Sequence, residues 1–175
     1  MLSNATPTAS VPGAGAQISR VPVPAAALSR RSRDALLSAA RAGLSESALA
    51  QVPGERYALA HLAGLRAAAA VLAVRARPRP GYRGRPASAW RLLATVAPEL
   101  SEWAAFYAAG AGKRAAAEAG LPVIDTREAD DLLRQTEAFV GVVEVLLGLP
   151  VQNTLPATVP MVSPSASRGG APVRA

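Results

Sequence analysis

The chain has 175 residues, with nineteen basic and twelve acidic side chains, one histidine and no cysteine. The lack of cysteine excludes disulfide bonds, zinc–thiolate sites and thiol chemistry. Three of the arginines lie outside residues 28–149, which leaves sixteen basic against twelve acidic side chains in that central part. The net charge of +7 is therefore weaker evidence for a nucleic-acid partner than its size suggests.

The two ends of the chain differ in composition from the middle. Residues 1–27 and 150–175 are rich in Ala, Pro, Ser, Thr and Gly and show no periodic apolar pattern. Such segments bury too little surface to offset the entropy of ordering, so we expect both to be disordered tails. Residues 28–149 are enough for one domain. The start shows no secretory pattern, and we expect a cytoplasmic protein.

The first predicted helix spans residues 29–42 and ends at Gly43, followed by a short helical turn over residues 45–50. A long helix then begins at Pro53 and runs to residue 76. It is apolar on almost every side and must be covered on almost every side. Its alanine-rich composition predicts too little hydrophobicity for a membrane span. Its main apolar stripe is predicted at Leu62, Leu65, Ala69 and Leu72. A second stripe places Tyr57 and His61 on the flank of the buried face.

Three further helices follow a break at residues 77–86. They are predicted over residues 88–96, 98–119 and 126–148, the last of these opened by a capping box of Asp125 and Glu128. The last helix has a buried stripe and an opposite solvated stripe of Asp130, Arg134, Glu137 and Glu144. No stretch alternates as a strand does. The predicted fold class is all-α, an antiparallel bundle of four to five helices.

Arg56 and His61 form an Arg-x4-His arrangement within the long helix. Cleavage of RNA needs a base for the 2′-hydroxyl and a cation for the phosphorane, and these two residue types supply both. Five residues along a helix, however, place the two side chains about 140° apart. The other interpretation of His61 is a packed core residue that is hydrogen-bonded to a neighbouring helix.

Six arginines surround the break after the long helix, with no acidic residue among them. They are Arg75, Arg77, Arg79, Arg83, Arg85 and Arg91. Arginine forks suit phosphates, and Tyr82 and Trp90 lie among them, so this segment is a candidate nucleic-acid surface. The alternative is an ordinary solvated loop. No pattern in the sequence predicts a metal site or a cofactor.

Several phrases, in order, make residues 30–148 resemble a small actinobacterial family of HEPN (higher eukaryotes and prokaryotes nucleotide-binding) domains. They are ERYALAHLAGLRAAAAVLA from Glu55, SAWRLL from Ser88, VAPEL from Val96, KRAAAEAG from Lys113 and READDLL from Arg127. The resemblance implies a helical bundle, often a homodimer, that binds RNA or nucleotide. In active HEPN nucleases the Arg-x4–6-His motif usually lies on a late helix. Here the pair lies on the second long helix, and the last helix has no histidine.

These observations favour a non-catalytic bundle that binds RNA, nucleotide or a protein partner through its arginine-lined surface, without a membrane role. One alternative is a metal-independent RNase, with Arg56 holding the phosphate and His61 acting as acid and base in a site shared across a dimer. The other alternative is a structural adaptor with no nucleic-acid role.

Overall fold

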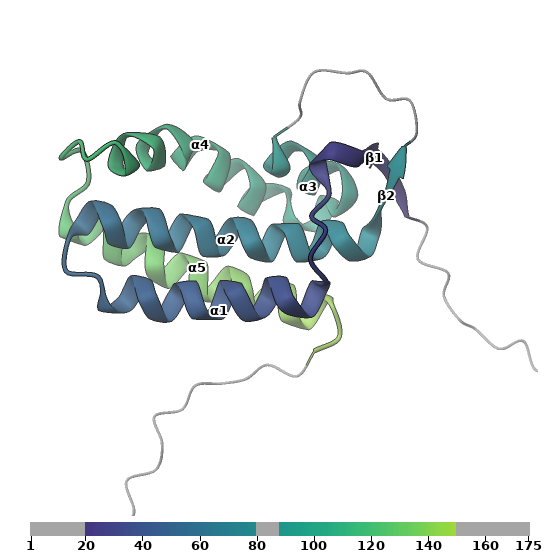
Figure 1. Cartoon of the computed structure of the whole chain (residues 1–175), viewed down its shortest axis with the longest axis horizontal. Coiled ribbons are helices and arrows are strands. Elements are labelled where there is room, and N and C mark those ends of the chain that lie inside the picture. Colours follow the sequence, from purple (N-terminus) through teal and green to yellow (C-terminus); the bar gives the residue numbers. More distant parts are fainter. Residues whose placement is uncertain (1–19, 80–87, 150–175) are drawn as a thin grey trace, which may run out of the picture.

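The long apolar stretch after Pro53 forms the central helix of the molecule, α2 (Pro53–Arg75). In the computed structural model, which describes residues 20–79 and 88–149, three helices lie along α2 (Figure 1). They are α1 (Arg33–Leu49), α4 (Ser101–Glu118) and α5 (Thr126–Leu146). A shorter helix, α3 (Ala89–Val96), packs on α2 and α4. The predicted all-α bundle is therefore confirmed.

Small side chains line the packed faces of α2. Ala60, Ala63, Ala67 and Ala70 are fully buried, whereas Leu62 and Leu65 are only partly buried. Of the predicted main stripe, Leu72 is buried, whereas Leu65 and Ala69 are half-buried against the core, because the closest helix contacts are made by smaller residues. The predicted burial of Tyr57 and His61 on the second stripe is confirmed.

Gly43 does not end the first helix, as the sequence predicts, and α1 continues unbroken to Leu49. The reason is contact with α2, because a Cβ on Gly43 would lie 3.4 Å from the Ala63 Cβ and 2.9 Å from an Arg66 guanidinium nitrogen. Gly43 therefore serves close helix packing and not a turn. The glycines that do terminate helices are Gly120 and Gly148, both with positive φ.

The expectation of no strands is wrong at one place. β1 (Val21–Pro24) pairs in parallel with β2 (Ala76–Arg79), with Val21 opposite Ala76 and Pro24 opposite Arg79. A one-turn 3-10 helix over Ala25–Ala27 follows β1. Val23 is buried in a small cluster with Leu72, Ala76, Leu92 and Val96, and this burial holds the strand in place.

The boundary predicted between tail and domain is therefore also wrong at the N-terminal side. Residues 20–27, which the sequence predicts as part of a disordered tail, belong to the folded part. Val23 packs in an apolar cluster, and the composition of residues 1–27 does not predict this burial. The rest of the predicted tails, residues 1–19 and 150–175, lies outside the described residues, as do residues 80–86 of the break predicted at residues 77–86.

The last two long helices follow the prediction closely. A one-turn 3-10 helix over Pro98–Leu100 leads into α4, and the side chain of Asp125 accepts a hydrogen bond from the backbone N–H of Glu128 at the start of α5. Glu144 is the exception on the stripe predicted to be solvated. Its side chain is buried and accepts a 2.7 Å hydrogen bond from Arg41 of α1, which neutralises it inside the bundle.

The hydropathy of α2 also differs from expectation. Over an 18-residue window its mean hydropathy is 1.6, so by length and composition α2 could cross a membrane, contrary to the sequence-based expectation. Just over half of that window is buried against the rest of the bundle. The same apolar composition therefore serves burial inside the protein.

Gly64 and Gly112 provide a matched test of this packing. A Cβ on Gly64 would lie 2.7 Å from the ring of Tyr107, which is itself fully buried, whereas a Cβ on Gly112 would meet nothing within 4 Å. We expect Gly64→Ala to lower the free energy of unfolding by about 1–3 kcal/mol through overpacking. Gly112→Ala should raise it by about 0.5–1 kcal/mol. Urea titration followed by circular dichroism measures both, and equal effects would contradict the close packing at Gly64.

Candidate functional site

His61 lies on α2 with only 2% of its surface exposed. Its ring meets two aromatic rings edge to face, Tyr107 at 5.4 Å and Trp90 at 5.8 Å between centroids. Tyr107 and Trp90 are in turn stacked on each other at 4.6 Å. The imidazole is therefore part of the aromatic core that joins α2, α3 and α4.

The hydrogen bonding of His61 defines its protonation. Its Nε2 lies 3.0 Å from the backbone carbonyl oxygen of Tyr107, and a carbonyl can only accept, so Nε2 carries a proton and donates it. Nδ1 is buried and has no partner among the described residues. A second proton there would be an unsatisfied buried donor. Burial accordingly lowers the pKa of His61, and the ring is neutral at neutral pH.

The hydroxyl of Tyr107 continues this buried polar network into α5. It donates a 2.9 Å hydrogen bond to Thr136 Oγ1, and the Thr136 hydroxyl donates to the Leu132 carbonyl at 2.8 Å. Burial raises the pKa of Tyr107, so the phenol stays protonated. Thr136 on an otherwise apolar stripe is thereby explained as a partner for Tyr107.

A cavity of about 260 Å³ lies beside His61, between α2, α4 and α5. Its walls include the rings of Tyr57, Phe106 and Tyr107. Lys113 of α4 and Glu128 of α5 also line it and form an ion pair with each other. Within this cavity the two charges are paired with each other, and His61 Nε2 donates its proton to the Tyr107 carbonyl.

Arg56 has different neighbours from His61. Its guanidinium donates twice to the carbonyl of Ala50, at 3.1 and 2.7 Å, and forms an ion pair with Asp130 of α5. Arg56 thereby satisfies a carbonyl at the C-terminal end of α1 and ties it to α5. No interaction among the described residues joins Arg56 to His61, so the structure does not bring the two candidate catalytic side chains together.

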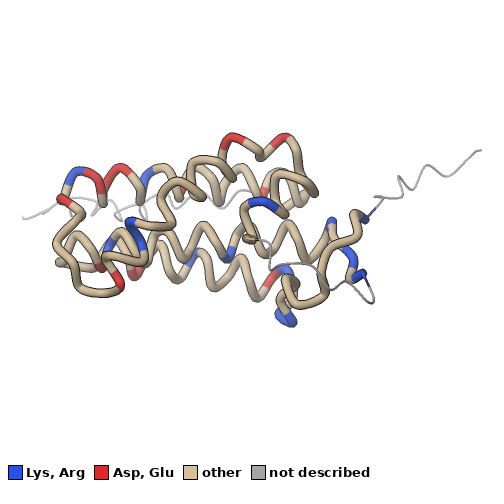
Figure 2. The backbone as a smooth tube through the Cα atoms, turned by 90° about the horizontal axis from the view of Figure 1, so that it is seen from above, with Lys and Arg blue, Asp and Glu red and all other residues tan. Residues whose placement is uncertain are grey.

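The six candidate nucleic-acid residues are placed as follows. Arg75 pairs with Glu99, while Arg77 and Arg79 on β2 and Arg91 on α3 are exposed. Arg83 and Arg85 lie outside the described residues. The tip of the molecule formed by β1 and β2 shows basic segments and no acidic one (Figure 2). Basic side chains thus gather at one end of the bundle, called the basic end from here on.

Sequence reasoning missed one residue of the basic end, Arg20. It is exposed and directly precedes β1, whose pairing with β2 brings it beside residues that follow it in the chain by more than fifty positions. No local sequence pattern predicts this strand pairing, because β1 is four residues long and half proline.

No group of three or more His, Cys, Asp or Glu side chains in the described ranges could hold a metal ion.

The comparison with known protein families matches residues 47–144 to the SAV_6107-like HEPN family. This region is more than half of the chain and contains α2 to α5 almost entirely, so the chain belongs to the HEPN family. The resemblance inferred from the sequence phrases is confirmed at the level of the family. No curated protein and no solved structure matches the chain.

The lowered pKa of His61 predicts a pH dependence of stability. The unfolded chain takes up a proton near pH 6.5 and the folded one does so only at lower pH, so the free energy of unfolding falls as the pH drops below that value. The slope is at most about 1.4 kcal/mol per pH unit. Urea unfolding at about pH 7.5 and about pH 5.5 measures it.

His61→Gln is the control for this prediction, because glutamine can still donate to the Tyr107 carbonyl but does not titrate. His61 is the only histidine in the chain, so the variant should show a much flatter dependence over the same range. An unchanged slope in the variant would contradict the assignment of a buried neutral imidazole.

Proposed function

We propose that this HEPN protein is a non-catalytic RNA-binding bundle that holds RNA phosphates at its basic end. The observation that carries the proposal is the grouping of exposed arginines from three separate segments around one small apolar cluster. Ala76 and Leu92, the chain neighbours of Arg77 and Arg91, pack in that cluster with Val23 of β1. β1 adds Arg20 to the same end.

The chemistry of arginine favours phosphate as the ligand. A guanidinium presents a rigid fork of donors that matches phosphate oxygens and stays charged at every physiological pH. Arg77 and Arg91 are exposed, so their forks can reach a ligand without prior rearrangement of the core. Trp90 is buried and stacked on Tyr107, so it is not available to stack on a base. The proposed binding therefore reads the backbone and carries little sequence specificity.

The absence of catalysis is proposed on the geometry of Arg56 and His61. A general base for the 2′-hydroxyl must reach the proton that it removes. His61 donates its Nε2 proton to a backbone carbonyl, and its other nitrogen is enclosed. Arg56 is engaged by Ala50 and Asp130. Both residues have structural partners that account for their presence.

The test compares two double variants of the full chain with the same loss of charge. Arg77→Ser with Arg91→Ser alters the basic end, while Arg127→Ser with Arg134→Ser removes two exposed arginines of α5. Binding of labelled single-stranded RNA is followed by anisotropy at several salt concentrations. Each lost phosphate contact should reduce the slope of log K against log salt by about 0.7. We expect a reduction of about 1.4 for the first variant and little change for the second.

Equal slopes for the two variants would mean that net charge and not the basic end binds the RNA. No binding by the unaltered chain would leave the adaptor alternative. The same samples, run on a denaturing gel, report cleavage. RNA cleavage that is lost in His61→Gln would overturn the proposal of a non-catalytic protein.

A further inference from the structure

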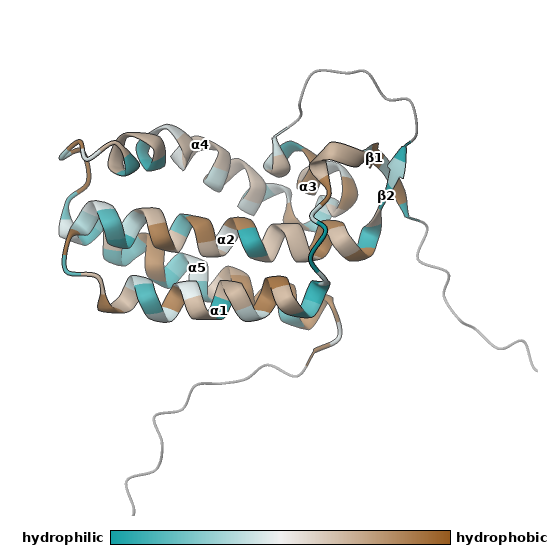
Figure 3. Ribbon diagram, viewed as in Figure 1, coloured by the Kyte–Doolittle hydropathy of each residue, from teal (hydrophilic) through white to brown (hydrophobic). Residues whose placement is uncertain are grey.

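Among residues 20–79 and 88–149, no helix packs over one side of α2. α1, α4 and α5 enclose the rest of the helix, but Ala58, Leu59 and Leu62 face a groove between α2 and the end of α4. Apolar segments are visible on the side of α2 between α1 and α4 (Figure 3). A helix that is apolar on every side should be covered on every side, so this face is incomplete as it stands.

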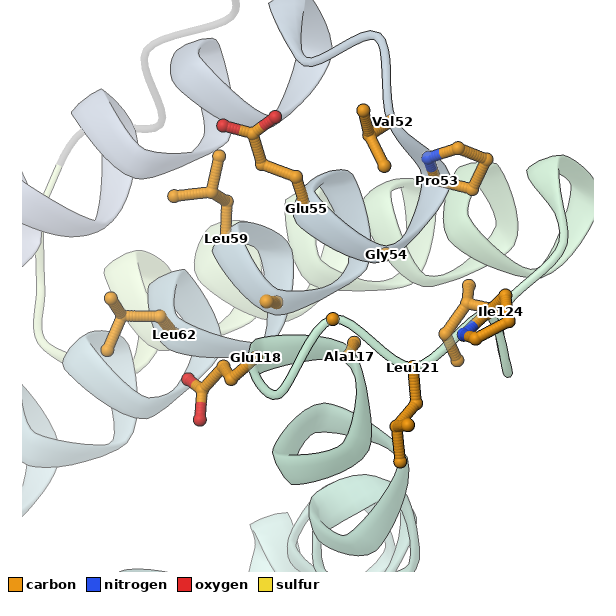
Figure 4. Close-up of a pocket in the computed structure, with 13 residues that line it drawn as sticks. Val52, Pro53, Gly54, Glu55, Leu59, Leu62, Ala117, Glu118, Leu121 and Ile124 are labelled. Atoms are coloured by element: carbon orange, nitrogen blue, oxygen red, sulfur yellow. The ribbon is translucent and has the colours of Figure 1, made fainter.

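The groove has a volume of about 570 Å³ and walls on two sides (Figure 4). One wall comes from the start of α2 and includes Val52, Leu59 and Leu62. The other comes from Ala117 and the segment after α4, with Leu121 and Ile124. The walls are therefore apolar side chains carried by two neighbouring elements, which is the geometry of a site that receives the apolar face of a helix.

The apolar surface continues past the groove onto the end of the bundle. Val52 is 59% exposed and Leu121 is 53% exposed, and both also line the groove. Leu49, at the end of α1, and Val123, after α4, are exposed as well. Exposed apolar side chains at the groove and on the two adjoining connections favour an interaction site.

Two carboxylates flank the groove, and they favour an occupant with positively charged side chains. Glu55 lies on the α2 wall and Glu118 on the α4 wall (Figure 4). Glu118 has a cation one turn before it, Arg114, at 3.6 Å, while Glu55 makes no ion pair within the described residues. An occupant with basic residues on the flanks of its apolar face would pair with both carboxylates.

We propose that this groove binds an amphipathic helix of a protein partner, with an apolar stripe seated on Leu59, Leu62 and Leu121 and basic residues paired with Glu55 and Glu118. The sequence of residues 1–19 and 150–175 predicts no such helix. Prolines divide residues 1–19 and 150–175 into stretches shorter than three helical turns.

The experiment uses two synthetic helical peptides as probes of the full chain. Both carry leucine at positions i, i+3, i+4 and i+7, and their flanking positions are lysine and arginine in one and glutamate in the other. Fluorescence anisotropy measures the dissociation constants. We expect the basic peptide to bind at least about tenfold more tightly than the acidic one. Glu55→Lys with Glu118→Lys should reverse this preference, because both changes lie on the surface and leave the apolar walls intact.

Matched apolar variants separate the groove from the rest of the surface. Val52→Ser with Leu121→Ser should weaken binding of the basic peptide about tenfold. Val142→Ser with Val145→Ser, which changes two exposed valines of α5, should leave it unchanged. Equal binding of the two peptides, or no binding of either, would overturn the proposal. So would self-association of the chain that disappears in Val52→Ser with Leu121→Ser, since the occupant would then be a second copy.

Discussion

The constraint on which the structure depends is that α2 has almost no polar side to offer to water. Its burial drives α1, α4 and α5 to pack along it, and the gain from removing apolar surface from water is the main stabilising contribution. The small residues of α2 determine how closely these neighbours come. Gly64 leaves room for the ring of Tyr107, and Ala63 lets α1 approach at Gly43. The aromatic rings then fill the space that alanine leaves, and His61 is enclosed as one of them.

Features that depend on neighbours in the sequence could be predicted. The starts of α2, α3 and α5 follow from Pro53, Ser88 and Asp125, because a helix N-terminus is defined by one proline or one capping side chain. The burial of His61 followed from helical periodicity. The role of Gly43 could not be predicted from its sequence neighbours, since a glycine that ends a helix and a glycine that allows close helix packing have the same local sequence pattern. Only the position of Ala63 distinguishes the two cases.

Features that depend on distant residues could not be predicted. The burial of Glu144 requires Arg41 of another helix, and the structural role of Arg56 requires Asp130. For the candidate site, the arginines near the end of α2 were recognisable as a group, but Arg20 joins them only through strand pairing. The groove was equally hidden, because an amphipathic pattern does not show which apolar face of a helix stays uncovered. The proposed RNA surface and the groove involve different elements, β1, β2 and α3 on one side and the α1–α2 and α4–α5 connections on the other.

The pairing of β1 with β2 has a consequence for the order in which the chain folds. Val21 and Ala76 are separated by the whole of α1 and α2, so their contact closes a long loop, and we expect it to form after those helices have packed. Val23 also needs Leu92 and Val96 of α3 to complete its apolar surroundings. The first strand should therefore be the last element to dock and the first to detach. Its release would uncover one small apolar cluster and scatter the basic end while the aromatic core around Tyr107 stays closed.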